Sequence, residues 1–122
     1  MKYFLLHILL LLFTLPGMTQ SLAPKQFKKQ VCRQKGIIID VRTPEEFRSE
    51  RIKGAVNVNT EEKNFIEKLD SLDHTKSYFL YCNTGKHSAR IVIYMRELGF
   101  TKVYDLEGGL KRWKEKKFKT IT

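Results

Sequence analysis

One cysteine of this sequence lies where a thiol could do chemistry. Cys82 directly follows the apolar residues 78–81, Gly85 comes three residues later, and apolar residues recur at helical spacing from Ser88 onward. A tight loop that leads into a helix directs its backbone N–H groups toward one point, where the helix dipole adds partial positive charge. Such a point stabilises a thiolate, so we predict that Cys82 is a reactive nucleophile. The other interpretation is an inert buried thiol at the end of a strand.

Two further motifs come at the ends of predicted strands. The β-branched run of residues 37–39 leads into Asp40 and Arg42, and residues 105–109 follow a strand that begins at Val103. Such runs are typical of parallel strands covered on both faces. Ligands of parallel sheets bind beyond the carboxyl ends of the strands, so we expect both motifs to share one crevice with Cys82. We interpret Asp40 and Arg42 as an ion pair that supports the crevice wall.

Helices are predicted between these strands. Thr43, Pro44 and Glu46 form the pattern of a capping box, and Asn59 with Glu62 suggests another helix start. We also expect a first helix over residues 25–33 that Gly36 ends, and a short strand at residues 55–58. In the later helices, Ile66 and Ile93 are expected to face inward, and Gly99 to form a left-handed cap. Trp113, on a last helix, is expected in the core of the protein. This alternation predicts an α/β domain with a mainly parallel sheet and helices on both faces.

In this order, the motifs resemble the single-domain rhodanese family, over about residues 24–117. The parts that match are residues 40–42, the turn at 52–55, Cys82-x-x-Gly85, residues 98–103, and Gly-Gly-x-x-x-Trp at 108–113. The resemblance implies one rhodanese-like domain at residues 24–120. It also implies a sulfur-carrying nucleophile, Cys82, in a substrate-binding loop made of Asn83, Thr84, Gly85, Lys86 and His87.

The resemblance further implies a sulfurtransferase. Such an enzyme moves a sulfane sulfur from a small anion such as thiosulfate to a thiol or cyanide-like acceptor, through a Cys82 persulfide. We expect a monomer that needs neither a metal nor an organic cofactor. The alternative is a non-catalytic rhodanese-like module that binds a partner or carries sulfur in the cell envelope. The physiological donor and acceptor stay open.

The chain departs from the usual family pattern at two places. His87 stands where arginine is commonest, and histidine is cationic only below about pH 6.5 in water. We therefore expect the charge of the loop to depend on pH, with Lys86 and Arg90 as further sources of positive charge. Residues 50–51 are Glu-Arg where the family usually has Gly-His, and we expect little effect on the chemistry.

Two rival chemistries also use a cysteine in such a loop. Phosphatases and arsenate reductases of related fold use a cysteine loop one residue longer that ends in arginine. The residue at that position is Ser88, which argues against this activity. Thiol redox chemistry would require Cys32 to reach Cys82, and we expect Cys32 to be a bystander.

The first twenty residues have the composition of a secretory signal peptide. Lys2 precedes a mostly apolar run at residues 4–15, and small or turn-forming residues follow, with cleavage expected near residues 19–21. Because the run is too short to span a bilayer, we expect export to the periplasm or the exterior and no stable membrane span. The net charge of +10 could attract anions to the site, and we expect no nucleic-acid partner.

Overall fold

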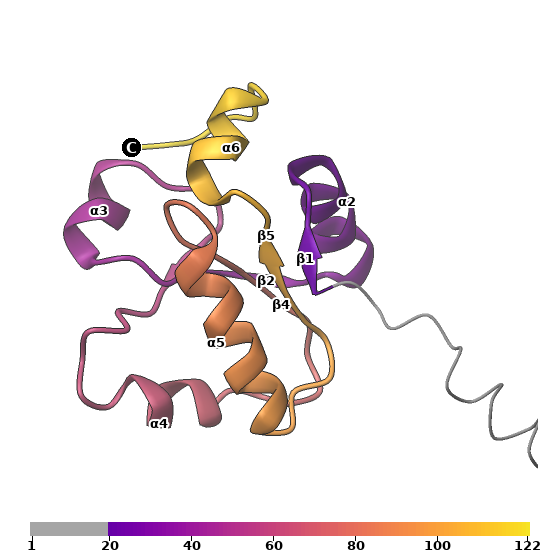
Figure 1. Ribbon diagram of the computed structural model, residues 1–122, viewed down its shortest axis with the longest axis vertical. Helices are drawn as coiled ribbons and strands as arrows, with labels where there is room; N and C mark the ends of the chain where they lie inside the picture. Colours follow the sequence, from indigo (N-terminus) through magenta and orange to yellow (C-terminus); the bar gives the residue numbers. More distant parts are fainter. Residues whose placement is uncertain (1–19) are drawn as a thin grey trace, which may run out of the picture.

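The computed structural model describes residues 20–122, so residues 1–19 of the predicted leader lie outside the described residues. Five parallel strands form one sheet in the order β1-β5-β4-β2-β3. The strands are β1 (Ser21–Leu22), β2 (Ile37–Asp40), β3 (Val56–Asn57), β4 (Tyr78–Tyr81) and β5 (Val103–Leu106). The helices are α2 (Pro24–Gln34), α3 (Pro44–Ser49), α4 (Phe65–Asp70), α5 (Lys86–Glu97) and α6 (Gly109–Glu115). Figure 1 shows this arrangement.

Helices cover both faces of the sheet, as the sequence predicts. Along β4, Tyr78 and Leu80 belong to a core cluster on the face of α5, whereas Phe79 and Tyr81 belong to a second cluster on the face of α2 and α6. This alternation follows from the two-residue repeat of side chains along a strand. Trp113 lies in the second cluster, so its predicted core position is confirmed.

The end of α2 differs from the expectation. Lys35 takes the left-handed conformation at the helix end, with φ of 50°, and Gly36 has no positive φ. Gly36 has a steric role, because a Cβ atom there would lie 2.2 Å from the Phe79 ring. The predicted left-handed residue after α5 is correct, since φ of Gly99 is 104°.

Around α3 and α4, one of the two predicted helix starts is correct. Thr43 and Glu46 form the expected capping box at α3. The start at Asn59 is wrong, because the Asn59 side chain accepts a hydrogen bond from the backbone of Glu61 at 3.1 Å and helix α4 begins at Phe65. Such local side-chain bonds compete with helix formation.

Ile66 and Ile93 are exposed rather than inward-facing, at 37% and 53%. Ile93 follows the buried Val92 by one residue, and one residue turns a helix by about 100°, which points Ile93 away from the core.

The edge strand β1 was not predicted, because two residues carry no periodicity. It pairs in parallel with β5, and the backbone N–H of Asp105 donates to the Gln20 carbonyl at 2.8 Å. Asp105 therefore lies inside β5 rather than after it, and its buried carboxylate accepts from Ser21 Oγ at 3.3 Å. Burial raises the pKa of Asp105 to about 6.

Within residues 20–122, no helix is long and apolar enough to cross a membrane.

Candidate active site

Cys82 lies directly after β4, with its sulfur held by the start of α5. The thiol is 6% exposed, and Sγ accepts hydrogen bonds from the backbone N–H groups of Gly85 at 3.1 Å and Ser88 at 3.4 Å. In the protonated state it donates to Ser88 Oγ at 3.4 Å, while the Ser88 hydroxyl donates to the Gly85 carbonyl at 3.3 Å. Gly85 has φ of 93°, which lets successive amides of the loop point at one atom. The arrangement is a nest for an anionic sulfur.

The start of α6 holds the other side of this loop. Backbone N–H groups of Leu110 and Lys111 donate to the carbonyls of Cys82 at 2.9 Å and Asn83 at 3.1 Å. Gly109 makes this approach possible, since a Cβ atom there would lie 2.6 Å from the backbone of Asn83. The Gly-Gly motif therefore reaches the predicted crevice, although Asp105 does not.

Asp40 and Arg42 form the ion pair that was predicted for the crevice wall. Arg42 Nη2 lies 2.7 Å from Asp40 Oδ2, and Arg42 Nε lies 3.1 Å from both carboxylate oxygens. Burial lowers the pKa of Arg42, but the hydrogen bonds and charge of Asp40, together with the contribution of Tyr81, outweigh it, and the pKa is raised overall. The guanidinium also donates to Asn83 Oδ1 at 3.4 Å and to the Glu50 carbonyl. The pair thus connects the cysteine loop with the turn at residues 50–51.

Asn83 orients the loop through both ends of its amide. Its oxygen accepts from Arg42, and its nitrogen donates to the Glu46 carboxylate at 2.5 Å. This hydrogen bond, together with those from Thr43, holds the pKa of Glu46 below its ordinary value. Because its amide is occupied within the protein, Asn83 supports the loop.

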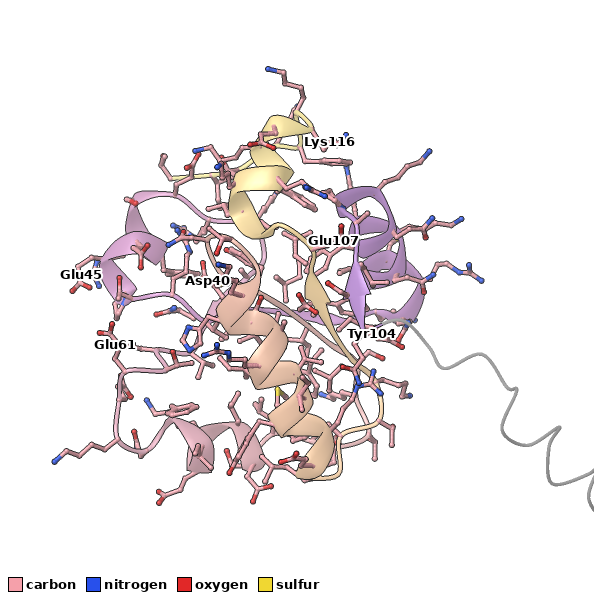
Figure 2. All side chains as sticks on the ribbon, viewed as in Figure 1. Asp40, Glu45, Glu61, Tyr104, Glu107 and Lys116 are labelled. Carbon is pink, nitrogen blue, oxygen red and sulfur yellow. The ribbon has the colours of Figure 1, made fainter. Side chains whose placement is uncertain are left out.

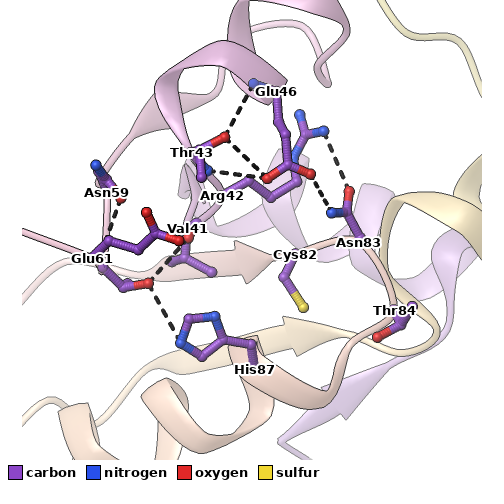
Figure 3. A pocket seen from close by; sticks show the side chains of 11 residues that line it. Val41, Arg42, Thr43, Glu46, Asn59, Glu61, Cys82, Asn83, Thr84 and His87 are labelled. Atoms are coloured by element: carbon purple, nitrogen blue, oxygen red, sulfur yellow. Dashed lines mark hydrogen bonds between the residues drawn. The ribbon is translucent and has the colours of Figure 1, made fainter.

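A pocket of about 250 Å³ lies beside the thiol. Figure 3 shows the Cys82 sulfur in the space bordered by His87 and Thr84. His87 Nε2 lies 3.4 Å from Thr60 Oγ1 across the pocket. The lining comes from three segments: Val41, Arg42, Thr43 and Glu46; Asn59, Thr60 and Glu61; and Cys82, Asn83, Thr84 and His87.

The predicted loop residues do not all reach this pocket. Cys82, Asn83, Thr84 and His87 line it, whereas Gly85 contributes its N–H group to the sulfur. Lys86 is exposed in the first turn of α5 and, like Arg90, does not line the pocket. The contact of Ser88 with the sulfur was not predicted, although the place of Ser88 six residues after Cys82, in the first turn of a predicted helix, could have indicated it.

Other lining residues of the pocket were also missed, among them Glu46, Thr60 and Glu61. These three residues come from segments distant in the sequence, and no motif joined them to Cys82.

Cys32 is an exposed free thiol on α2, and Cys82 is a buried free thiol in the cluster on the other face of the sheet. Among the described residues, no cluster of three or more His, Cys, Asp or Glu could hold a metal ion.

Fold and site together define an α/β domain with a cysteine-containing loop at the carboxyl edge of a parallel sheet. The family model described as the rhodanese-like domain matches residues 23–116. The chain belongs to the rhodanese-like family. Its fold is similar to the crystal structure of a rhodanese-related protein from Thermoplasma volcanium, with a TM-score of 0.73 and 25% sequence identity over 84% of this chain and 97% of that one.

Similar proteins carry two kinds of name. Thiosulfate sulfurtransferase PspE of Escherichia coli is 34% identical over 73 residues, which cover 60% of this chain and 69% of the relative. A tRNA uridine(34) hydroxylase of Cytophaga hutchinsonii is also 34% identical, over 97 residues that cover 77% of this chain. This match spans only 31% of the hydroxylase's own length. The match with a third similar protein, the uncharacterized YqhL of Bacillus subtilis, spans 62% of that protein.

Proposed function

We propose that this chain is a sulfurtransferase that carries a sulfane sulfur as a persulfide on Cys82. The observation that carries the proposal is the surroundings of Sγ, where two backbone N–H groups donate to the sulfur and the Ser88 hydroxyl lies 3.4 Å away, in a chain of the rhodanese-like family. The name thiosulfate sulfurtransferase, borne by relatives, supports thiosulfate as a donor. The acceptor in this proposal is a thiol or a cyanide-like nucleophile.

The first half-reaction loads the cysteine. The Cys82 thiolate attacks the outer sulfur of thiosulfate and forms an S–S bond. The bond inside the donor breaks, and sulfite leaves with the electron pair. On ionisation the Ser88 hydroxyl can turn from the Gly85 carbonyl to donate to Sγ, because it lies within reach of both.

The second half-reaction unloads the persulfide. The acceptor attacks the outer sulfur, the S–S bond to Cys82 breaks, and the thiolate is restored with its electron pair. The outer sulfur projects into the pocket beside His87 and Thr84 in this proposal. Protonation of His87 would add positive charge near that sulfur.

We also propose that residues 1–19 are removed during export. The described fold begins at the edge strand β1, so cleavage just before Gln20 keeps both the strand and the Gln20 carbonyl that accepts from Asp105. Cleavage after Ser21 would remove half of the strand. N-terminal sequencing of the protein recovered from a cell-envelope fraction tests this. An intact leader on cytoplasmic protein would contradict export.

The test of sulfur transfer is the intact mass of the purified protein after exposure to thiosulfate, with and without cyanide. We expect a gain of about one sulfur atom that cyanide removes. Cys82→Ser should lack the gain, and Cys32→Ser, which changes the other free thiol, should keep it.

Two results would contradict the proposal. No mass gain in a folded protein would favour the non-catalytic module. A loss of two hydrogen atoms, two protons with two electrons taken by an oxidant such as dissolved oxygen, that reduction reverses would indicate a Cys32–Cys82 disulfide and redox chemistry instead.

A further inference from the structure

A second cavity lies on the face of the sheet opposite the thiol. It is a groove of about 610 Å³ between α2 and the end of α6, and it shares no lining residue with the pocket beside Cys82. Ile38 of β2, Trp113 of α6 and Phe118 are among its apolar lining residues. Ligand pockets in proteins commonly have 300–1,000 Å³ and a mainly apolar lining, so the groove has the size of a small-molecule site.

The charges at this groove all have one sign. Five lysines line it, Lys28, Lys53, Lys116, Lys117 and Lys119, and no Asp or Glu does. Within residues 20–122, none of the five takes part in an ion pair within 4.0 Å. Figure 2 shows Lys116 at the end of α6. An apolar groove with an unneutralised cationic rim complements an apolar ligand with an anionic group.

The backbone conformation of residues 117–119 fixes one wall of the groove. Lys117 has φ of 66°, a left-handed conformation that costs a non-glycine residue stability, and it turns the chain so that Phe118 packs on Trp113 with ring centroids 4.8 Å apart. The indole N–H of Trp113 donates to the Lys119 carbonyl at 3.0 Å, which ties the segment to α6. The groove wall is therefore built before any ligand binds.

The aromatic rings argue for an aliphatic ligand rather than a nucleic acid. Single-stranded nucleic acids need exposed ring faces on which bases stack. Trp113 is only 5% exposed, with Phe27 and Phe118 packed against it. Lys28 Nζ lies 5.4 Å from the centroid of the Phe118 ring, so that ring already has a cation near it. These rings therefore offer little free face for base stacking, whereas an acyl chain needs only apolar contact.

We propose that this groove binds a free amphiphilic anion, a single acyl chain with a carboxylate head. The chain lies along the apolar lining and the carboxylate pairs with the lysines of the rim. This site is separate from the sulfur-transfer pocket and does not depend on Cys82.

Trp113 allows a direct test, because it is the only tryptophan of the chain. The purified protein is titrated with dodecanoate below its micelle concentration, and both tryptophan emission and calorimetric heat are recorded. We expect saturable 1:1 binding, with no comparable binding of dodecyltrimethylammonium, acetate or single-stranded oligodeoxythymidine. Absence of saturable heat and emission change with dodecanoate overturns the proposal, as does equally tight binding of the cationic amphiphile or the oligonucleotide.

Two triple variants with the same change in net charge locate the site. Lys53→Gln/Lys116→Gln/Lys119→Gln removes rim lysines, whereas Lys63→Gln/Lys76→Gln/Lys102→Gln removes exposed lysines that do not line the groove. We expect the rim variant to bind dodecanoate about tenfold more weakly or worse, and the control within about twofold of the original protein. Equal weakening in both folded variants would show a general charge effect and overturn the site. Binding only to anionic vesicles, and not to monomeric dodecanoate, would overturn it in favour of a membrane surface.

Discussion

Replacing Gly85 by alanine tests whether the geometry of the cysteine loop sets the rate of the proposed sulfur transfer. Gly85 has φ of 93°, and a Cβ atom would lie 3.0 Å from Gly108 N and 3.3 Å from the Leu106 carbonyl oxygen. Both neighbours are backbone atoms of the β5–α6 segment, which cannot move aside as a flexible side chain would. The loop must therefore shift, and the N–H group of residue 85 must move from its position 3.1 Å from Cys82 Sγ.

The expected size follows from two contributions. A left-handed non-glycine residue costs roughly 1–2 kcal/mol of folding stability. Loss of a hydrogen bond to a charged group costs about 1.5–3 kcal/mol, which corresponds to roughly 10- to 150-fold in rate. We expect Gly85→Ala to lower kcat/KM for thiosulfate by that factor, beyond any loss of stability.

Gly54→Ala is the matched control. Gly54 also has a left-handed φ, 86°, but no heavy atom lies within 4 Å of its added Cβ. The control should therefore lose a similar 1–2 kcal/mol of stability in urea unfolding and keep its kcat/KM. If folded Gly85→Ala transferred sulfur as fast as Gly54→Ala, the loop N–H would have no catalytic role and our account of the thiolate would be wrong.

Three other changes have defined outcomes. Ser88→Ala removes the hydroxyl 3.4 Å from Cys82 Sγ and should lower kcat/KM about 2- to 12-fold; an unchanged rate would exclude the hydroxyl from the mechanism. Glu61→Gln removes a carboxylate from the pocket lining, so kcat/KM for thiosulfate should rise about 2- to 5-fold at low salt, and a gain that persists in high salt would not be electrostatic. Burial raises the pKa of Asp105 from 3.8 to about 6, so the folded state keeps a proton that the unfolded chain loses, and stability falls as pH rises through this range. Asp105→Asn should therefore match the original protein in urea unfolding near pH 4 and exceed it by up to about 3 kcal/mol at pH 8; the same difference at both pH values would contradict this linkage.

The sequence indicated the elements that have strong local signals. The β-branched run before Asp40 and the apolar run before Cys82 predicted two central strands, and the Thr43 to Glu46 capping box predicted a helix start. Sequence signals failed at Asn59, where a competing local hydrogen bond formed, and at β1, where a tertiary contact decided the outcome. The sequence predicts a helix cap at Asn59, but its side chain accepts a hydrogen bond from the Glu61 backbone and no helix begins there. The two-residue strand β1 forms only because β5 lies beside it.

The sequence alone therefore determined the α/β class, the rhodanese-like family and the position of the thiol, since these depend on residue periodicity and on short motifs. Only the tertiary structure decided which side chains surround that thiol. Glu46, Thr60 and His87 are far apart in the chain and meet in one pocket because parallel strands place their following loops at the same edge. Likewise, the lysine-rimmed groove exists only because α2 and α6 pack on the same face of the sheet, which no local pattern encodes.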